Sequence, residues 1–406
     1  MPELIRLSKK DNIAITHEAI PKDTLVGNNQ IRTKTIIPKD HKIAIKGILK
    51  GEKILKYGQI IGKASNNIEA GEHVHNHNMT FIEFERNIFE QSVSNIKLKN
   101  NSYSRTFLGY ERKNGKVGTR NYIGLVSTVN CSATVVKLIA NKINDYLNQN
   151  SFNNIDGAVC LKHSSGCGMN TDDYGMEVFY RTIEGFKNHP NFSHVFVVGL
   201  GCECAQISLF QHQQSSNVKY LNIQDEGGSK SIVNKCFKMI CEVLPEANNI
   251  NRTTLPVEKL SVALQCGGSD SYSGITANPA LGYASDILVS FGGSTILSET
   301  PEIYGAEHLL KGRTNDKNLQ NKIDKHIAWW QNYTKINGGS LDNNPSPGNK
   351  KGGLTTILEK SLGATAKGGK SELVDVIDYG ERIKINGFNF MNSPGFDPVS
   401  VTGQVA

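Results

Sequence analysis

Side chains that can bind metals or transfer protons follow several apolar segments of this sequence. Each lies within a few residues of the end of its segment. The segments, with the residues that follow them, are 122–126 with Asn130 and Cys131, 157–161 with His163 and Cys167, 195–199 with Cys202 and Glu203, 261–264 with Cys266 and Asp270, and 294–297 with Glu299 and Glu302. Thiols, imidazoles and carboxylates at such positions can hold a metal ion or act as general acids and bases.

The apolar segments alternate with helical patterns, and this alternation predicts parallel βαβ units. Helical periods cover residues 133–147, 279–290 and 315–335, and further strands are expected at 218–223, 373–377 and 388–391. The carboxyl ends of parallel strands lie at one edge of a sheet, where α/β proteins bind their ligands. We therefore expect the five sites to converge on one edge, which favours an enzyme.

Taken singly, each of these positions also has a structural interpretation. Cys202 can be a small buried hydrophobic residue, and His163 can be a hydrogen-bonded core histidine. The glycines and Ser-Asp of residues 267–270 can cap a helix. Gly199-Leu200-Gly201 lacks the third glycine and the ribose-binding acid of a dinucleotide fingerprint, so we expect no nucleotide cofactor.

The first 80 residues read as short strands separated by turns, for example at 12–15 and 42–45, and predict a small all-β module. His75 and His77 are two residues apart, so on a strand they would face one side, about 7 Å apart. Two such imidazoles can share a divalent metal, although an exposed polar strand end would look the same. Polar residues 81–108 predict a linker, and the body at 109–406 is expected to divide near residue 255.

Composition excludes several classes of protein. The net charge is +7 in 406 residues, but the basic residues are scattered rather than gathered in a stripe, which argues against nucleic-acid binding. A mild basic excess suits a small anionic substrate, or is a property of the surface alone. The N-terminus has no apolar signal segment and no run approaches a membrane span, so we expect a cytoplasmic protein without a membrane partner. Its eight cysteines are then thiols or ligands, and the lack of a CxxC pair argues against a structural zinc knuckle.

Longer strings are more specific than these single positions. They are Gly71–His75, Val117–Asn121, Gly199–Glu203, Cys266–Pro279, Ser298–Glu302 and Asn344–Gly353. With them the sequence resembles the altronate/galactarate dehydratase family from near residue 10 to its last residue. The resemblance implies an SAF-type β-clip domain over residues 1–80, followed by a Rossmann-like α/β body with a mainly parallel sheet. The family continues past the motif at 402–406, so we expect a C-terminal part to be missing.

The resemblance also implies a reaction. The family dehydrates hexonates or hexarates to 2-keto-3-deoxy acids with a divalent metal, for which we expect Fe²⁺, with Mn²⁺ as the alternative. Altronate is the first expected substrate and galactarate the second. A sulfolactate sulfo-lyase-like enzyme and a non-catalytic sugar-acid-binding fragment are the competing functions. The expected partners are a small sugar acid and further copies of the chain in a homo-oligomer.

These arguments give three sets of candidate residues. The predicted metal ligands are His75, His77, His163, Cys167, Glu203 and Cys266. The predicted catalytic residues are Asp270, Glu299 and Lys350, and the predicted substrate-binding residues are Asn130, Gly267, Gly268, Ser269 and Lys351. Because Gly267 and Gly268 carry no Cβ, ligand and backbone can approach closely there. We expect the segments 266–270 and 345–353 to share a carboxylate-binding pocket.

Overall fold

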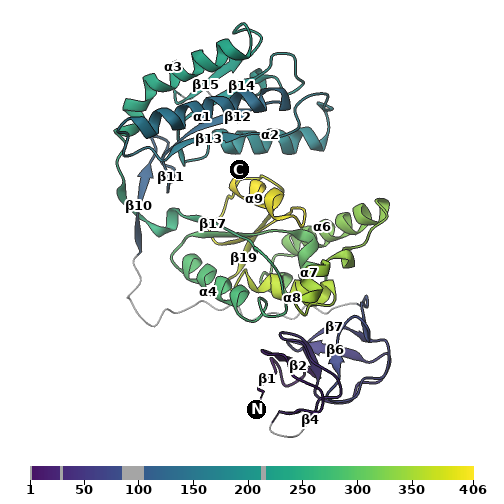
Figure 1. The fold of residues 1–406 in the computed structure, drawn as a ribbon. Coiled ribbons are helices and arrows are strands. Elements are labelled where there is room, and N and C mark those ends of the chain that lie inside the picture. The colour runs from purple at the N-terminus through teal and green to yellow at the C-terminus, as the bar shows by residue number, and fades with distance from the viewer. Residues whose placement is uncertain (1, 28–30, 85–104, 212–215) are drawn as a thin grey trace. The chain divides into compact units, whose positions relative to one another are not determined.

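The computed structural model describes residues 2–27, 31–84, 105–211 and 216–406, and it has the α/β architecture that the sequence predicts (Figure 1). The chain forms two compact units. One contains residues 1–99, 261–378 and 385–401, and the other contains residues 100–260, 379–384 and 402–406. Of the predicted linker, residues 85–104 lie outside the described residues, and β10 already begins at Thr106.

The N-terminal β module consists of short strands that pair antiparallel with one another. In sheet order they form β1-β2-β5-β8, β6-β7-β9 and β3-β4. The strands are β1 (Leu4–Ile5), β2 (Ile13–Thr16), β3 (Leu25–Val26), β4 (Ile31–Arg32), β5 (Lys42–Ala44), β6 (Lys53–Lys56), β7 (Gln59–Ala64), β8 (His73–Val74) and β9 (Met79–Thr80). Within the described residues, no strand of the module joins a parallel sheet, so the predicted all-β start followed by an α/β body is confirmed.

The strand expected to carry His75 and His77 is shorter than predicted. β8 ends at Val74, and residues 75–78 form a turn in which the backbone N–H groups of Asn78 and Met79 both donate to His75 O. The side chain of Asn78 closes this turn by accepting from the His75 N–H at 3.0 Å. An asparagine that bonds to nearby backbone favours a turn over a continued strand.

The same unit contains a parallel sheet with the order β17-β18-β20-β19. Its strands are β17 (Ser261–Leu264), β18 (Ser294–Leu297), β19 (Leu373–Ile377) and β20 (Phe388–Met391). Its helices are α4 (Ala277–Ser290), α5 (Glu307–Lys311), α6 (Lys317–Ile336), α7 (Pro347–Lys351), α8 (Ile357–Ala366) and α9 (Asp397–Val405), the last of which extends into the other unit. Leu264, Leu297, Phe388 and Phe390 are buried with apolar residues of α5 and α6 in one core.

The β module packs on this part of its own unit through apolar and ionic contacts. Its core continues into the buried side chains of Ala306 and Leu362. Lys42 and Lys56 both reach Glu359 on α8, with Nζ to carboxylate-oxygen distances of 2.8 and 2.7 Å, and all three side chains are fully buried. Burying any one of these three charges without its partners would cost much free energy. The ion triad therefore holds the β module against α8.

The second unit has a parallel sheet of its own, in the order β13-β12-β14-β15. Its strands are β12 (Tyr122–Ser127), β13 (Gly157–Leu161), β14 (Phe192–Gly199) and β15 (Val218–Asn222), and a small antiparallel sheet joins β10 (Thr106–Glu111), β11 (Val117–Gly118) and β16 (Thr253–Pro256). Buried faces of α1 (Ala133–Gln149) and α3 (Ser229–Asn248) pack together against the parallel sheet, and α2 (Tyr174–Lys187) contributes Ile183 to a second core.

The expectation of one common sheet edge is therefore wrong, because the strands form two sheets in different units. The strands themselves match: 157–161, 261–264, 294–297, 373–377 and 388–391 have the predicted bounds. Local apolar patterns show where strands form, but not which of them pair. Among the described residues, no helix has the length and hydropathy needed to cross a membrane.

Candidate active site and metal centre

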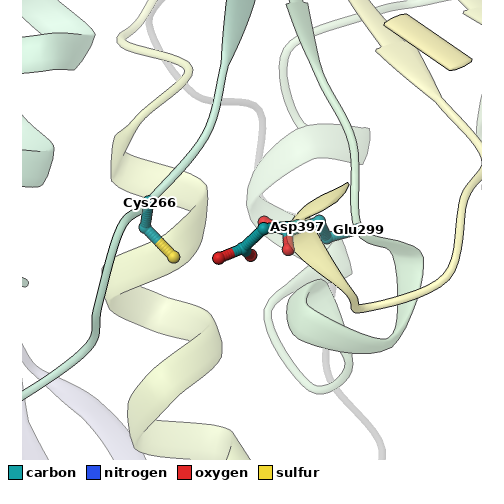
Figure 2. A group of neighbouring side chains, drawn as sticks. All are labelled: Cys266, Glu299 and Asp397. Atoms are coloured by element: carbon teal, nitrogen blue, oxygen red, sulfur yellow. The ribbon is translucent and has the colours of Figure 1, made fainter. Parts of the chain in front are cut away.

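Three side chains from neighbouring strand ends meet at the carboxyl edge of the β17–β20 sheet. Cys266 follows β17, Glu299 follows β18, and Asp397 follows β20 at the start of α9. Figure 2 shows the thiol of Cys266 directed toward the Asp397 carboxylate, with Glu299 beyond it. One ligand atom from each residue lies within 4.8 Å of the others, and no other described His, Cys, Asp or Glu group of three or more meets that spacing.

This donor set fits a divalent metal ion. Glu299 is 1% exposed, and its Oε1 is buried without a hydrogen-bond partner. The neighbouring Asp397 carboxylate can satisfy that oxygen only through a shared proton or a shared cation. One thiolate and two carboxylates suit a borderline ion such as Fe²⁺, rather than Ca²⁺ or Mg²⁺, which prefer oxygen alone. Of the predicted ligands, only Cys266 belongs to this group.

Glu299 is held in an unfavourable backbone conformation. Its φ of 69° lies in the left-handed region, which costs a non-glycine residue roughly 1–3 kcal/mol. The Glu299 N–H donates to Ser393 Oγ at 2.9 Å, which helps to fix this conformation. Burial, together with the nearby Glu302, raises the pKa of Glu299 to about 7, against the opposing effect of Lys367. A strained, perturbed carboxyl group is typical of a functional site.

Two lysines balance the acidic groups. Lys367 Nζ lies 3.2 Å from Glu299 Oε2, and Lys360 Nζ lies 2.6 Å from Glu302 Oε1. Burial opposes the charge of Lys367, but the neighbouring Cys266 and the two glutamates raise its pKa, so it stays cationic. Glu302 Oε1 also accepts from Asn344 Nδ2 at 2.9 Å, whereas the buried Glu302 Oε2 has no partner.

A cavity of about 500 Å³ adjoins this group, a volume ordinary for a small-ligand site. Most of its lining residues carry polar or charged side chains. The residues are Cys266, Gly268, Ser269, Glu302, Asn343, Asn344, Ser346, Asn349, Lys360, Gly395, Phe396 and Asp397. A cavity with amides, hydroxyls, two carboxylates and an ammonium group offers many partners to a polyhydroxylated anion.

The segments after β17 and around α7 lie side by side at this cavity, as the sequence suggests. Asn349 Nδ2 donates to Ser269 O at 2.7 Å, and the Ser271 N–H donates to Gly352 O at 2.9 Å. Ser269 and Gly268 line the cavity, and a Cβ at Gly267 or Gly268 would meet no atom within 4 Å.

The predicted catalytic residues have different surroundings. Asp270 Oδ1 accepts the backbone N–H groups of Tyr272 and Ser273, so it closes a turn. Lys350 is not among the cavity-lining residues, while Glu299 belongs to the group with Cys266 and Asp397 that could hold a metal ion. The acid–base roles of Asp270 and Lys350 stay predictions.

A histidine cluster of the β module (His41, His73, His75 and His77) supports the α7 segment from outside the cavity. His75 Nε2 donates to Lys350 O at 2.9 Å, and His41 Nε2 donates to Lys351 O at 3.0 Å. His41 Nδ1 then accepts from His73 Nε2 at 2.9 Å. Burial lowers the pKa of His41, and lowers those of His73 to about 3 and His75 to about 4, so these rings are neutral.

The cluster therefore connects the β module to the wall of the cavity. Lys351, predicted to bind substrate, contributes its backbone carbonyl to this contact. Metal ligation by His75 and His77 stays a prediction.

The remaining predicted residues lie in the other unit, at the carboxyl edge of the β13–β15 sheet. Both ring nitrogens of His163 are hydrogen-bonded, Nε2 to Ser127 O and Nδ1 to the Ser165 N–H. The Glu203 carboxylate accepts from Thr128 Oγ1 and from two backbone N–H groups. Both residues thus hold loops in place. Asn130 and Cys167 are on the same edge.

The sequence interpretation missed Asp397, Lys360 and Lys367. Asp397 had a usable signal, because like Cys266 and Glu299 it follows an apolar strand within a few residues. Lys360 and Lys367 lie on or next to α8, where a lysine ordinarily faces solvent. Nothing local distinguishes them from surface lysines.

Comparison with known proteins agrees with this architecture. Residues 2–81 match the altronate/galactarate dehydratase SAF domain, residues 109–248 match the second domain of D-galactarate dehydratase/altronate hydrolase, and residues 257–406 match the C-terminal domain of D-galactarate/altronate dehydratase. These matches follow the described β module and the two parallel sheets.

Curated relatives match over nearly the whole chain. Altronate dehydratase of Bacillus subtilis is 34% identical over 100% of this chain and 82% of its own length. Altronate dehydratase of Escherichia coli is 33% identical over 98% of this chain and 81% of its own. Galactarate dehydratase (L-threo-forming) of E. coli is 34% identical over 99% of this chain and 79% of its own. The chain belongs to the altronate/galactarate dehydratase family of hydro-lyases.

Proposed function

We propose that this protein is a metal-dependent dehydratase of a sugar acid, with altronate as the first substrate and galactarate as the second. The observation that supports this most strongly is the group of Cys266, Glu299 and Asp397 beside a cavity that is lined mostly by polar residues. Two of the relatives described above are altronate dehydratases, and the third is a galactarate dehydratase. The product would be the 2-keto-3-deoxy acid.

The metal proposed for this site is Fe²⁺, with Mn²⁺ as the alternative, held by Cys266, Glu299 and Asp397. When bound, it would supply a Lewis acid that stabilises negative charge on the substrate carboxylate and α-hydroxyl. The protein's own contribution is a fixed donor set. The left-handed backbone at Glu299 and its hydrogen bond to Ser393 keep that carboxylate in place.

Glu302 is our candidate for the base that removes the proton α to the carboxylate. Glu302 lines the cavity, and its Oε1 accepts hydrogen bonds from Lys360 and Asn344. Its other oxygen, Oε2, has no hydrogen-bond partner and is therefore the atom that would accept the proton. The C–H proton would pass to Oε2, and the protonated Glu302 would return it to the β-hydroxyl as the C–O bond breaks. Water would leave, and the resulting enol would tautomerise to the 2-keto acid. Lys360 and the amides of Asn344 and Asn349 would orient the substrate's carboxylate and hydroxyl groups.

A 2-ketoacid assay tests this function. The purified chain would be incubated anaerobically with a panel of hexonates and hexarates, with ferrous iron, with manganese, or after treatment with a chelator. We expect release of ketoacid from altronate or galactarate that is lost with chelation and restored by metal. Sulfite release from sulfolactate would favour the sulfo-lyase alternative. Saturable binding of sugar acids without turnover would favour the non-catalytic one.

A further inference from the structure

The edge of the β13–β15 sheet carries three cysteines that the proposed dehydration does not use. Cys131 follows β12, Cys167 follows β13, and Cys202 follows β14. β12 pairs with both β13 and β14, so the three cysteines come from three adjacent strands. All three are free and exposed. Exposed thiols are prone to oxidation, so three of them on one sheet edge indicate a functional role for this edge.

The loops that carry these cysteines are joined to one another around Gly166. The Asn130 N–H donates to Ser165 O at 2.9 Å, which ties the Cys131 loop to the Cys167 loop. The Ala205 N–H donates to Gly166 O at 3.3 Å, which ties in the Cys202 loop. Gly166 has a φ of 96°, and a Cβ there would lie 2.2 Å from Thr128 O. The close approach of the first two loops therefore requires glycine at this position.

Buried polar contacts hold the Cys131 and Cys202 loops together. Glu203 is 3% exposed, and its Oε1 accepts from Thr128 Oγ1 at 2.8 Å and from the Leu200 N–H at 3.0 Å. Ser132 Oγ donates to Val198 O at 2.8 Å on the adjacent strand. These bonds keep the thiol-bearing loops ordered, whereas the thiols themselves remain accessible. Three accessible thiols therefore lie on loops that are bonded to one another.

The donor type and spacing narrow the class of ligand. Three thiolates without carboxylates or free imidazoles select thiophilic centres such as zinc or iron–sulfur clusters. The three sulfur atoms do not all lie within 4.8 Å of one another, since only the Cys266 group does so among the described residues. A single ion would need them closer, whereas a cluster holds its cysteines further apart. In addition, α1 begins two residues after Cys131, and a helix N-terminus favours negative charge nearby.

We propose that Cys131, Cys167 and Cys202 bind a [4Fe–4S] cluster at this edge. Three protein ligands would leave one iron open to solvent or to an oxygen ligand, because four cysteines are the usual complement. The site is separate from the Cys266 group in both residues and donor chemistry. This inference does not depend on the proposed dehydration.

Anaerobic reconstitution of the full chain with ferrous iron and sulfide tests the site. We expect visible sulfur-to-iron charge-transfer absorption, with about four sulfide and about five iron per chain, four of them in the cluster and one at the Cys266 group. Cys131→Ser, Cys167→Ser and Cys202→Ser should each abolish the absorption, while Cys241→Ser on α3 and Asp397→Asn should keep it. Thermal unfolding of each apo variant verifies folding, since exposed substitutions usually change stability by less than about 0.5 kcal/mol.

Three results would overturn the inference. The first is a folded wild-type chain that takes up no sulfide with its iron. The second is a cluster content in the three serine variants equal to that of the wild type. The third is metal analysis that finds one zinc per wild-type chain and none in the serine variants, because the three thiols would then bind a single ion.

Discussion

The two parallel sheets present reactive side chains at the same kind of edge but with different chemistry. At the β17–β20 edge, Cys266, Glu299 and Asp397 are gathered closely, and buried lysines balance the charge. At the β13–β15 edge, the thiols are exposed, and the buried carboxylate of Glu203 is bonded to the loops around it. The fold supplies the edge in both cases. The residue types after each strand determine which ligand each edge can hold.

The edges also differ in what supports them. The β module contacts the loops of the β17–β20 edge in two ways. Lys56 Nζ donates to Ser271 Oγ, and the histidine cluster donates to backbone carbonyls of the α7 segment. The β13–β15 edge is held by hydrogen bonds among its own loops. The first edge should therefore respond to substitutions in the β module.

Removing a ligand from the compact edge should have the largest effect. Asp397→Asn keeps the size of the side chain but weakens its bond to a cation. We expect kcat/KM for ketoacid formation to fall at least about a thousandfold, which corresponds to an activation free energy higher by about 4 kcal/mol. Iron-binding titrations should show a matching loss of affinity. Unchanged activity and iron affinity in a folded Asp397→Asn protein would show that this carboxylate is not a ligand.

Breaking the buried ion triad should destabilise the β module's contact with α8. Glu359→Gln leaves Lys42 and Lys56 buried without their carboxylate, which costs about 3–5 kcal/mol. Denaturant unfolding would measure this loss. The matched control is Glu226→Gln, which removes a partly exposed pair with Lys235 and should cost no more than about 1 kcal/mol. Equal effects in the two variants would refute the triad's role.

The same carboxylate gives a pH dependence. Burial would raise the pKa of Glu359, but the two lysines outweigh it and lower the value to about 2 from the ordinary 4.5. A depressed carboxyl pKa stabilises the fold above the ordinary value, and this stabilisation is lost as pH falls toward 2. The stability difference between wild type and Glu359→Gln should therefore shrink between pH 4.5 and 2. A constant difference across that range would contradict the assignment.

Removing the proposed base should lower turnover even where the protein stays folded, although it also leaves the nearly buried Lys360 without its carboxylate. In Glu302→Gln the side chain keeps its bond to Asn344 but cannot accept the substrate proton. We expect kcat to fall about a hundredfold with a smaller change in KM. Steady-state kinetics on the preferred sugar acid would measure both. A rise in KM alone would make Glu302 a binding residue.

The histidine contact should give the smallest effect. His75→Leu removes the N–H that holds Lys350 O, and we expect kcat/KM to fall about tenfold, as for other supporting residues. His75→Gln places an amide N–H near the position of Nε2 and should restore most of the activity. Equal losses in both variants would favour metal ligation by His75, because glutamine cannot replace imidazole as a ligand there.

Most strands of the two sheets could be predicted because their apolar segments are local signals. The triad at Glu359 could not, because a lysine in a short strand gives no sign of its burial until a distant carboxylate is placed against it. Cys266 and Glu299 were identified by following strand ends, and Asp397 follows the same rule. The turn at residues 75–78 was missed because alternating histidines resemble a strand, and the bonding of Asn78 decides otherwise.

Crystals grown anaerobically with ferrous iron would test the central claim most directly, through anomalous scattering at the iron absorption edge. The account predicts an iron peak bonded to Cys266 Sγ and to carboxylate oxygens of Glu299 and Asp397, in protein that releases ketoacid. Absence of iron from that position in equally active, iron-loaded protein would contradict it.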